Sequence, residues 1–203
     1  MRKVDPRKHE EKRRKILHAA VECFAARGFH QTSTAEICAR AGMSPGNLFH
    51  YFPNKHAIIA AIVEEEGSET SAYFADVSRS TDLFAELISF MDVILGLAAD
   101  TAYLSLTLEI TAEATRDPRI GELVARNDRE LQDALNALLR NAAARGQVDP
   151  KLDPAGSARW IAALIDGIFS RAAIDPGFRP LEEREMLQLL LTRFLRPVMS
   201  NTP

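Results

Sequence analysis

Apolar side chains recur every three to four residues along almost the whole chain, and this helical periodicity limits the possible folds more than any other feature. In residues 9–27 a stripe that runs from Ile16 to Phe24 lies opposite charged side chains, as in a helix with one buried face. The same period, together with helix start and stop residues, predicts further helices at about 33–41, 44–52, 55–76, 82–99, 118–145, 154–173 and 181–196.

One segment has a mixed pattern. In residues 102–115, leucines 104, 106 and 108 alternate with other residues at the period of a β-strand. No neighbouring segment offers a second strand, and an isolated strand is unstable, so we expect a helix here as well. The prediction is an all-α fold of about nine helices.

Composition excludes several classes of protein. With 203 residues and 46% apolar side chains, the chain can bury a core without disulfides or metal. Cys23 and Cys38 form no CxxC pair and have no partner at metal-ligand spacing, which predicts a reduced intracellular protein with no metal and no cofactor. The N-terminal residues are charged, unlike a signal peptide, and the longest apolar run (87–99) is too short to cross a bilayer. We therefore expect a cytoplasmic protein without a membrane partner.

Charge is distributed unevenly. Residues 1–55 contain 11 Lys and Arg against 5 Asp and Glu, whereas residues 56–203 contain 14 against 23. A basic head on an acidic body is typical of a DNA-binding module joined to a different domain. The alternative is a basic tail that only faces water. The same two alternatives apply to an N-terminal arm formed by Arg2, Lys3, Arg7 and Lys8.

Two short helices near the N-terminus predict a helix-turn-helix. Ser33 and Glu36 have the spacing of a capping box, and Gly42 ends the first helix. Ser44 and Pro45 then form the start signal of the second helix. In such a motif the second helix presents its first residues to base edges in the major groove. The alternative is an ordinary helical hairpin whose polar side chains face water.

Residues near this turn have the chemistry to contact DNA. Pro45 and Gly46 are small, so the second helix can approach the floor of the major groove closely. Asn47 has the amide that pairs with adenine. His50 can reach a base or a phosphate. The remaining phosphate candidates are the hydroxyls before and at the start of the first helix, a tyrosine near the end of the second helix and a lysine after it: Thr32, Ser33, Thr34, Tyr51 and Lys55.

The stretch GFHQTSTAEICARAGMSPGNLFHYFPNK, residues 28–55, closely resembles the DNA-binding segment of the tetracycline-repressor (TetR) family of bacterial regulators. The resemblance implies DNA contacts from Thr32, Ser33, Ser44, Gly46, Asn47, Phe49, His50, Tyr51 and Lys55. Phe49 stands where the family often has tyrosine, so a phosphate hydrogen bond is lost there, and Ser33 replaces a commoner threonine. The segment MSPGNLFHYF is most similar to the BetI-type branch.

The resemblance also implies that residues 1–54 form the DNA-binding domain and residues 55–203 a ligand-sensing and dimerising domain. The apolar stripes of the last two helices predict a four-helix dimer interface formed by Leu164, Ile165, Ile168, Met186, Leu190 and Phe194. Residues that could line an effector pocket are Tyr73, Phe90, Met91, Tyr103, Glu109, Glu113, Trp160 and Phe169. In both sets the alternative is that the apolar residues only fill the core of one chain, and that the two glutamates face water.

These observations predict a homodimeric, ligand-responsive repressor that binds a pseudo-palindromic operator and is released by a small molecule. One alternative is a DNA-binding regulator without a ligand or controlled by a partner. An all-helical enzyme is disfavoured: the chain has no Glu-x-x-His, HExxH, P-loop, GxGxxG or GxSxG motif, and all five histidines lie within residues 1–56. We therefore expect no catalytic site.

Overall fold

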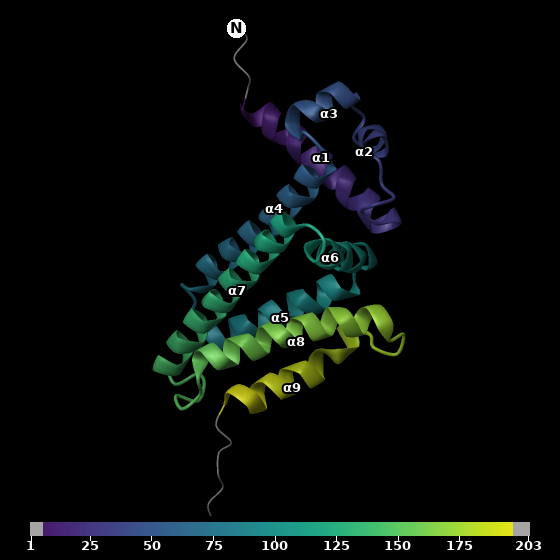
Figure 1. The fold of residues 1–203 in the computed structure, drawn as a ribbon. Helices are drawn as coiled ribbons and strands as arrows, with labels where there is room; N and C mark the ends of the chain where they lie inside the picture. The colour runs from purple at the N-terminus through teal and green to yellow at the C-terminus, as the bar shows by residue number, and fades with distance from the viewer. Residues whose placement is uncertain (1–5, 197–203) are drawn as a thin grey trace, which may run out of the picture. The chain divides into compact units, whose positions relative to one another are not determined.

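A computed structural model describes residues 6–196 of the chain (Figure 1). Over this range the protein forms nine α-helices, one short 3-10 helix and no β-strand, which confirms the predicted all-α class. The elements in chain order are α1 (Pro6–Arg27), α2 (Thr34–Ala41), α3 (Pro45–Tyr51), α4 (Lys55–Val77), α5 (Leu83–Ala99), α6 (Thr101–Ala114), α7 (Pro118–Ala144), α8 (Pro154–Ile174), η1 (Pro180–Glu183) and α9 (Arg184–Leu195).

Most predicted helices agree with these bounds, and three details differ. The segment with strand-like alternation is the helix α6. The predicted last helix, 181–196, is instead a 3-10 turn followed by α9. Helix α1 begins at Pro6, so Arg7 and Lys8 belong to a helix and not to an arm, while Arg2 and Lys3 lie outside the described residues.

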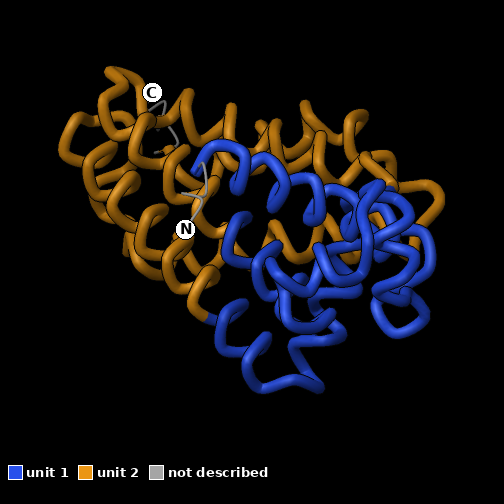
Figure 2. The backbone as a smooth tube through the Cα atoms, turned by 90° about the horizontal axis from the view of Figure 1, so that it is seen from above, with its two compact units in different colours: residues 1–66, 102–125 blue, residues 67–101, 126–203 orange. Residues whose placement is uncertain are grey.

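The chain divides into two compact units, which Figure 2 colours separately. Unit 1 contains residues 1–66 and 102–125, and unit 2 contains residues 67–101 and 126–203. Unit 1 thus extends past residue 54, where the predicted DNA-binding domain ends. It does so because the start of α4, most of α6 and the start of α7 share one core with α1–α3.

The core of unit 1 consists of large apolar side chains from all six of these segments. Phe24, Ile37 and Leu48 are completely buried and come from α1, α2 and α3. Ile58 of α4 and Ile120 of α7 are also completely buried, in the same cluster. Burying a side chain of this size contributes about 1.5–3 kcal/mol. The helix-turn-helix is therefore held on α1 and α4, and α6 and α7 close the same core.

Unit 2 is built around α5. Eight of its 17 residues are buried, which fits a helix that is apolar on nearly every side. Helices α8 and α9 and the turn η1 pack against it. No helix among the described residues has the length and hydropathy needed to span a bilayer.

Candidate nucleic-acid interface

Helices α2 and α3 form the predicted helix-turn-helix, and local hydrogen bonds define both ends of the turn. Gly42 ends α2 in the left-handed region, with φ of 62° and ψ of 44°. There its N–H donates to the Ala39 carbonyl at 3.2 Å, and the Met43 N–H donates to the Cys38 carbonyl at 3.0 Å. An L-residue with a Cβ is strained at this φ, so glycine permits the tight turn.

Both short helices begin at the predicted caps. The Ser33 hydroxyl accepts from the Glu36 N–H at 3.2 Å, and the Glu36 carboxylate accepts from the Ser33 N–H at 2.8 Å, which completes a capping box. At α3 the Ser44 hydroxyl accepts from the Asn47 N–H at 3.4 Å. Helices of eight and seven residues depend on such caps, because they are too short to be stable alone.

Helix α3 has one buried face and one exposed face. Leu48 and the following Phe52 are buried and attach the helix to unit 1. The exposed residues are Ser44, Pro45, Gly46, Phe49 and His50, with Asn47 half-buried at their edge. A Cβ added to Gly46 would meet no atom of residues 6–196 within 4 Å, so packing among these residues does not require glycine at this position. This exposed face coincides with the predicted DNA-reading residues.

The N-terminal half of α1 lies beside this face. The His9 ring packs on the half-buried Tyr51 ring, with centroids 4.6 Å apart, and lies 6.5 Å from the His50 ring. The Arg13 guanidinium lies 5.8 Å from the centre of the Phe52 ring. Basic side chains of α1 thus reach the surroundings of α3, which adds positive charge where a phosphate backbone would pass.

Two predicted phosphate contacts are instead part of the interior of unit 1. Thr32 is 2% exposed, and its hydroxyl donates to the carbonyls of Cys23 (3.1 Å) and Gly28 (2.9 Å). The prediction of a free Thr32 hydroxyl is therefore corrected: it joins the end of α1 to the next turn. Ser33 is exposed and Thr34 is half-buried, and the Ser33 hydroxyl is engaged in the capping box.

Lys55 is the second predicted phosphate contact whose side chain bonds within unit 1. Its ammonium donates to the carbonyls of Phe29, His30 and Thr32 and lies 4.4 Å from the centre of the Phe29 ring. Burial lowers the pKa of Lys55 below its ordinary value, against the opposing attraction of Glu113 and Glu36. A contact of this lysine with phosphate would compete with three internal carbonyls.

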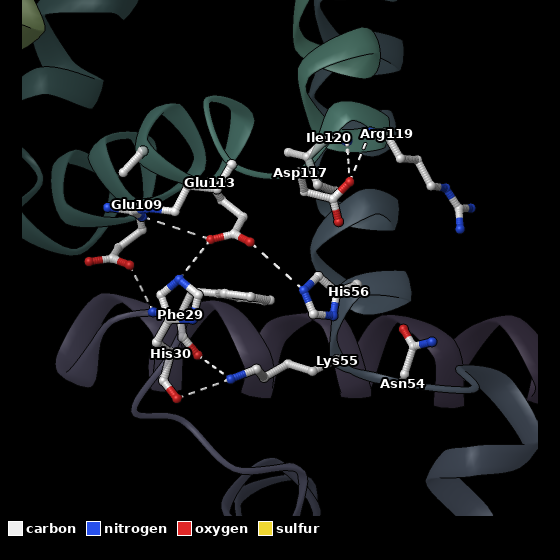
Figure 3. Close-up of polar contacts among 12 residues, drawn as sticks. Phe29, His30, Asn54, Lys55, His56, Glu109, Glu113, Asp117, Arg119 and Ile120 are labelled. Carbon is white, nitrogen blue, oxygen red and sulfur yellow. Dashed lines mark hydrogen bonds and ion pairs between the residues drawn. The ribbon is translucent and has the colours of Figure 1, made fainter.

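The predicted pocket residues are divided between the two units. In unit 2, Tyr73 and Phe90 stack at 5.4 Å, and Met91 and Phe169 are buried. Trp160, in contrast, is 72% exposed on α8. Tyr103, Glu109 and Glu113 belong to unit 1. The two glutamates face the turn after α1 and the start of α4, and not an aromatic pocket (Figure 3).

The predicted dimer residues separate into exposed and buried groups. Met186, Leu190 and Phe194 of α9 are exposed, and Leu164 of α8 is half-buried next to them in two shallow apolar hollows. Ile165 and Ile168 are instead buried within the chain. Further exposed apolar residues of the same two helices and the turn between them were not predicted: Ile174, Leu181 and Leu189. Trp160, predicted for the pocket, also borders one of these hollows.

An all-α chain with a capped helix-turn-helix on its N-terminal core defines a helix-turn-helix transcriptional regulator. The family model "Bacterial regulatory proteins, tetR family" matches residues 16–62, and "BetI-type transcriptional repressor, C-terminal" matches residues 87–196. The second match alone spans more than half of the chain. The protein belongs to the TetR family, and its C-terminal part is of the BetI type.

Individual relatives agree with this assignment. The chain is 28% identical to the HTH-type transcriptional regulator UidR of Escherichia coli K12 over 162 residues, which are 78% of this chain and 80% of UidR. The solved structure of Salmonella enterica GusR has 31% identity and a TM-score of 0.75, covering 90% of this chain and 94% of GusR. A Saccharomonospora viridis regulator in complex with choline, with 22% identity and a TM-score of 0.80, has the same fold over 93% of this chain and 100% of its own. The relatives are transcriptional regulators and not enzymes.

Proposed function

We propose that this regulator is a homodimer that represses transcription by binding a pseudo-palindromic operator through α3, and that a small-molecule effector releases it. The observation that carries the proposal is the exposed face of α3, where Gly46 and Asn47 lie beside His50 and no packing contact of the described residues requires the glycine. Residues 1–54 supply the DNA contacts, and residues 55–203 bind the effector and the second copy. The protein acts where the chromosome is, in the cytoplasm.

The dimer is argued from the apolar surface of α8 and α9. Trp160, Met186, Leu190 and Phe194 are 38–72% exposed and gather around two apolar hollows. Contiguous exposed apolar surface of this kind marks an interaction site. A second copy placed by a two-fold axis buries the same residues from both chains and presents two recognition helices to two half-sites.

Effector release requires that the ligand and DNA favour different conformations of the dimer. A coupling of about 1–3 kcal/mol between the two sites changes DNA affinity by about 5–150-fold. The aromatic interior of unit 2, with Tyr73, Phe90 and Phe169, is where we place the effector. The alternative, a regulator without a ligand, predicts that no metabolite raises the melting temperature or changes DNA affinity.

Selection of bound fragments from random duplex DNA, with and without metabolites, tests the proposal. We expect a palindromic consensus whose recovery falls when the effector is present. Failure to enrich any duplex sequence at low salt contradicts an operator-binding function.

Asn47→Ala tests the base-reading role of α3. We expect it to weaken binding to the selected operator by about 5–150-fold, because a bidentate base contact is worth about 1–3 kcal/mol, and to leave binding to unrelated duplex unchanged. The control is Asn141→Ala, an exposed asparagine of α7 in unit 2. An equal loss of affinity for the operator and for unrelated duplex would show that Asn47 contacts the phosphate backbone and not a base.

A further inference from the structure

Glu113, near the end of α6, is a buried carboxylate that the proposed function does not use. It is 3% exposed, and its Oε2 atom is buried without a hydrogen bond among the described residues. The His30 Nε2 lies 3.0 Å from this oxygen, at ion-pair distance but without hydrogen-bond alignment. A buried carboxylate is costly unless a cation or hydrogen bonds compensate its charge. A bound cation beside Glu113 would therefore stabilise the buried charge in addition to the neighbouring His30 and Arg116 side chains.

Two more ligand atoms converge on the same carboxylate. The His56 Nε2 lies 3.8 Å from the Glu113 Oε1, and one ligand atom each from His56, Glu113 and Asp117 lie within 4.8 Å of one another. Ligands of a tetrahedral metal ion with bonds of about 2.0–2.2 Å are separated by about 3.3–3.6 Å. Metal binding would draw the three atoms from within 4.8 Å of one another to that separation. They come from the start of α4, the end of α6 and the residue before α7, all within unit 1.

Neighbouring groups already hold these ligands in place. The Asp117 Oδ1 accepts from the backbone N–H groups of Arg119 (2.8 Å) and Ile120 (3.4 Å). The His56 ring packs edge-on against the Phe29 ring, with centroids 5.1 Å apart. Figure 3 shows the Glu113 carboxylate between His30 and His56, with Asp117 on the far side of His56 from Lys55. Outer contacts of this kind orient ligands in metal sites and are themselves important for affinity.

We propose that His56, Glu113 and Asp117 bind a divalent first-row transition-metal ion, with Zn²⁺ and Co²⁺ as suitable probes. An imidazole and two carboxylates suit such ions, whereas Mg²⁺ and Ca²⁺ prefer oxygen ligands alone. Two carboxylates neutralise the ion, and His30 and Arg116 remain on the other oxygen of Glu113. Three protein ligands leave a position for water. The bound ion would join the start of α4 to the corner between α6 and α7.

The competing explanation is a purely structural pair between His30 and Glu113 without a metal ion. Arg116, with its Nη1 3.9 Å from the Glu113 Oε2, would contribute to the same pair. This explanation predicts no saturable metal binding at the site. It also predicts that replacing His56 has no effect on metal affinity.

Titration of the tag-free, EDTA-treated full chain with Co²⁺ and Zn²⁺ distinguishes the two. We expect one ion per chain, visible absorption of bound Co²⁺, and a rise in melting temperature with Zn²⁺ that Mg²⁺ at the same concentration does not produce. Absence of saturable Co²⁺ and Zn²⁺ binding overturns the proposal, as does an equal shift with Mg²⁺.

Variants locate the ion. His56→Phe keeps an aromatic ring against Phe29 and removes the ligand, and Asp117→Asn keeps a side-chain oxygen for the N–H groups of α7 and removes the charge. Each should lower the Zn²⁺ affinity at least tenfold while circular dichroism shows an unchanged helix content. The control is His18→Ala, an exposed histidine of α1. Undiminished affinity in both ligand variants, or a matching loss in the control, overturns the assignment, and the wild-type titration decides the question even if a variant fails to fold.

Discussion

At the scale of single residues, a substitution of Thr32 can show whether its hydroxyl stabilises the fold or contacts DNA. Its buried hydroxyl donates to two carbonyls at the end of α1. Thr32→Val keeps the shape and removes the donor, so we expect a loss of about 1 kcal/mol in the free energy of unfolding, measured by urea denaturation.

The matched control for this prediction is Thr34→Val, at the half-buried first residue of α2, which should change stability by less than about 0.5 kcal/mol. DNA affinity of folded Thr32→Val protein should stay at the wild-type value. Unchanged stability combined with weaker DNA binding would restore the phosphate contact that the resemblance implied for Thr32.

At the scale of helices, the capping box of α2 predicts a dependence of stability on pH. The N–H and the hydroxyl of Ser33 bond to the Glu36 carboxylate and lower its pKa below the ordinary 4.5, and Arg27 adds to the effect. A lowered folded-state pKa means that the carboxylate stabilises the fold above its unfolded pKa and that this contribution is lost as the pH falls through the folded-state value.

Glu36→Gln should therefore lose part of the wild-type stability at neutral pH and show a shallower decline on acidification, measured by urea denaturation between pH 3 and pH 7. Glu10→Gln, on the exposed face of α1, is the control. If the free energy of unfolding falls as steeply with acidification in Glu36→Gln as in the wild type, the capping box does not contribute to the pH dependence.

The corner between α6 and α7 allows a second test at this scale. A Cβ on Gly121 would lie 2.7 Å from the backbone oxygen of Ala114, which cannot move without moving the end of α6. Gly121→Ala should lower the melting temperature although alanine favours helices. Gly96→Ala, in the exposed interior of α5 with nothing within 4 Å, should raise stability by up to about 1 kcal/mol. Equal behaviour of the two variants would contradict this close approach.

At the scale of the whole molecule, the apolar surface of α9 predicts the assembly. Leu190→Glu places a charge in the centre of the proposed dimer interface, and we expect a monomer of half the mass by light scattering. Its affinity for an operator with two half-sites should fall well below that of the wild type, because the two DNA-binding domains are no longer linked in one dimer. Leu108→Glu, at a similarly exposed leucine of α6, is the control and should remain dimeric. A dimeric Leu190→Glu protein would place the interface elsewhere.

Which features could be predicted from the sequence depends on how far apart the interacting residues are. The ends of α2 and α3 follow from Ser33, Gly42 and Ser44, whose hydrogen bonds are made within a few residues. The 3-10 turn at Pro180 and the boundary of unit 1 inside α4 were not predicted, because they depend on packing with segments far along the chain. For the same reason, the exposure of Trp160 could not be read from an apolar stripe that a core helix would share.

By itself, the sequence determined most of the helices, the caps of α2 and α3 and the polar face of α3, because periodicity and capping act within one or two turns. Only the tertiary structure decided the surroundings of Thr32, Lys55 and Glu113. The same three side chains would suit a surface that binds phosphate or ligand, but Thr32 and Glu113 are buried and the Lys55 ammonium is bonded to three carbonyls in the folded chain. The meeting of His56 with Glu113 and Asp117 likewise arises from packing between distant segments, which no local pattern records.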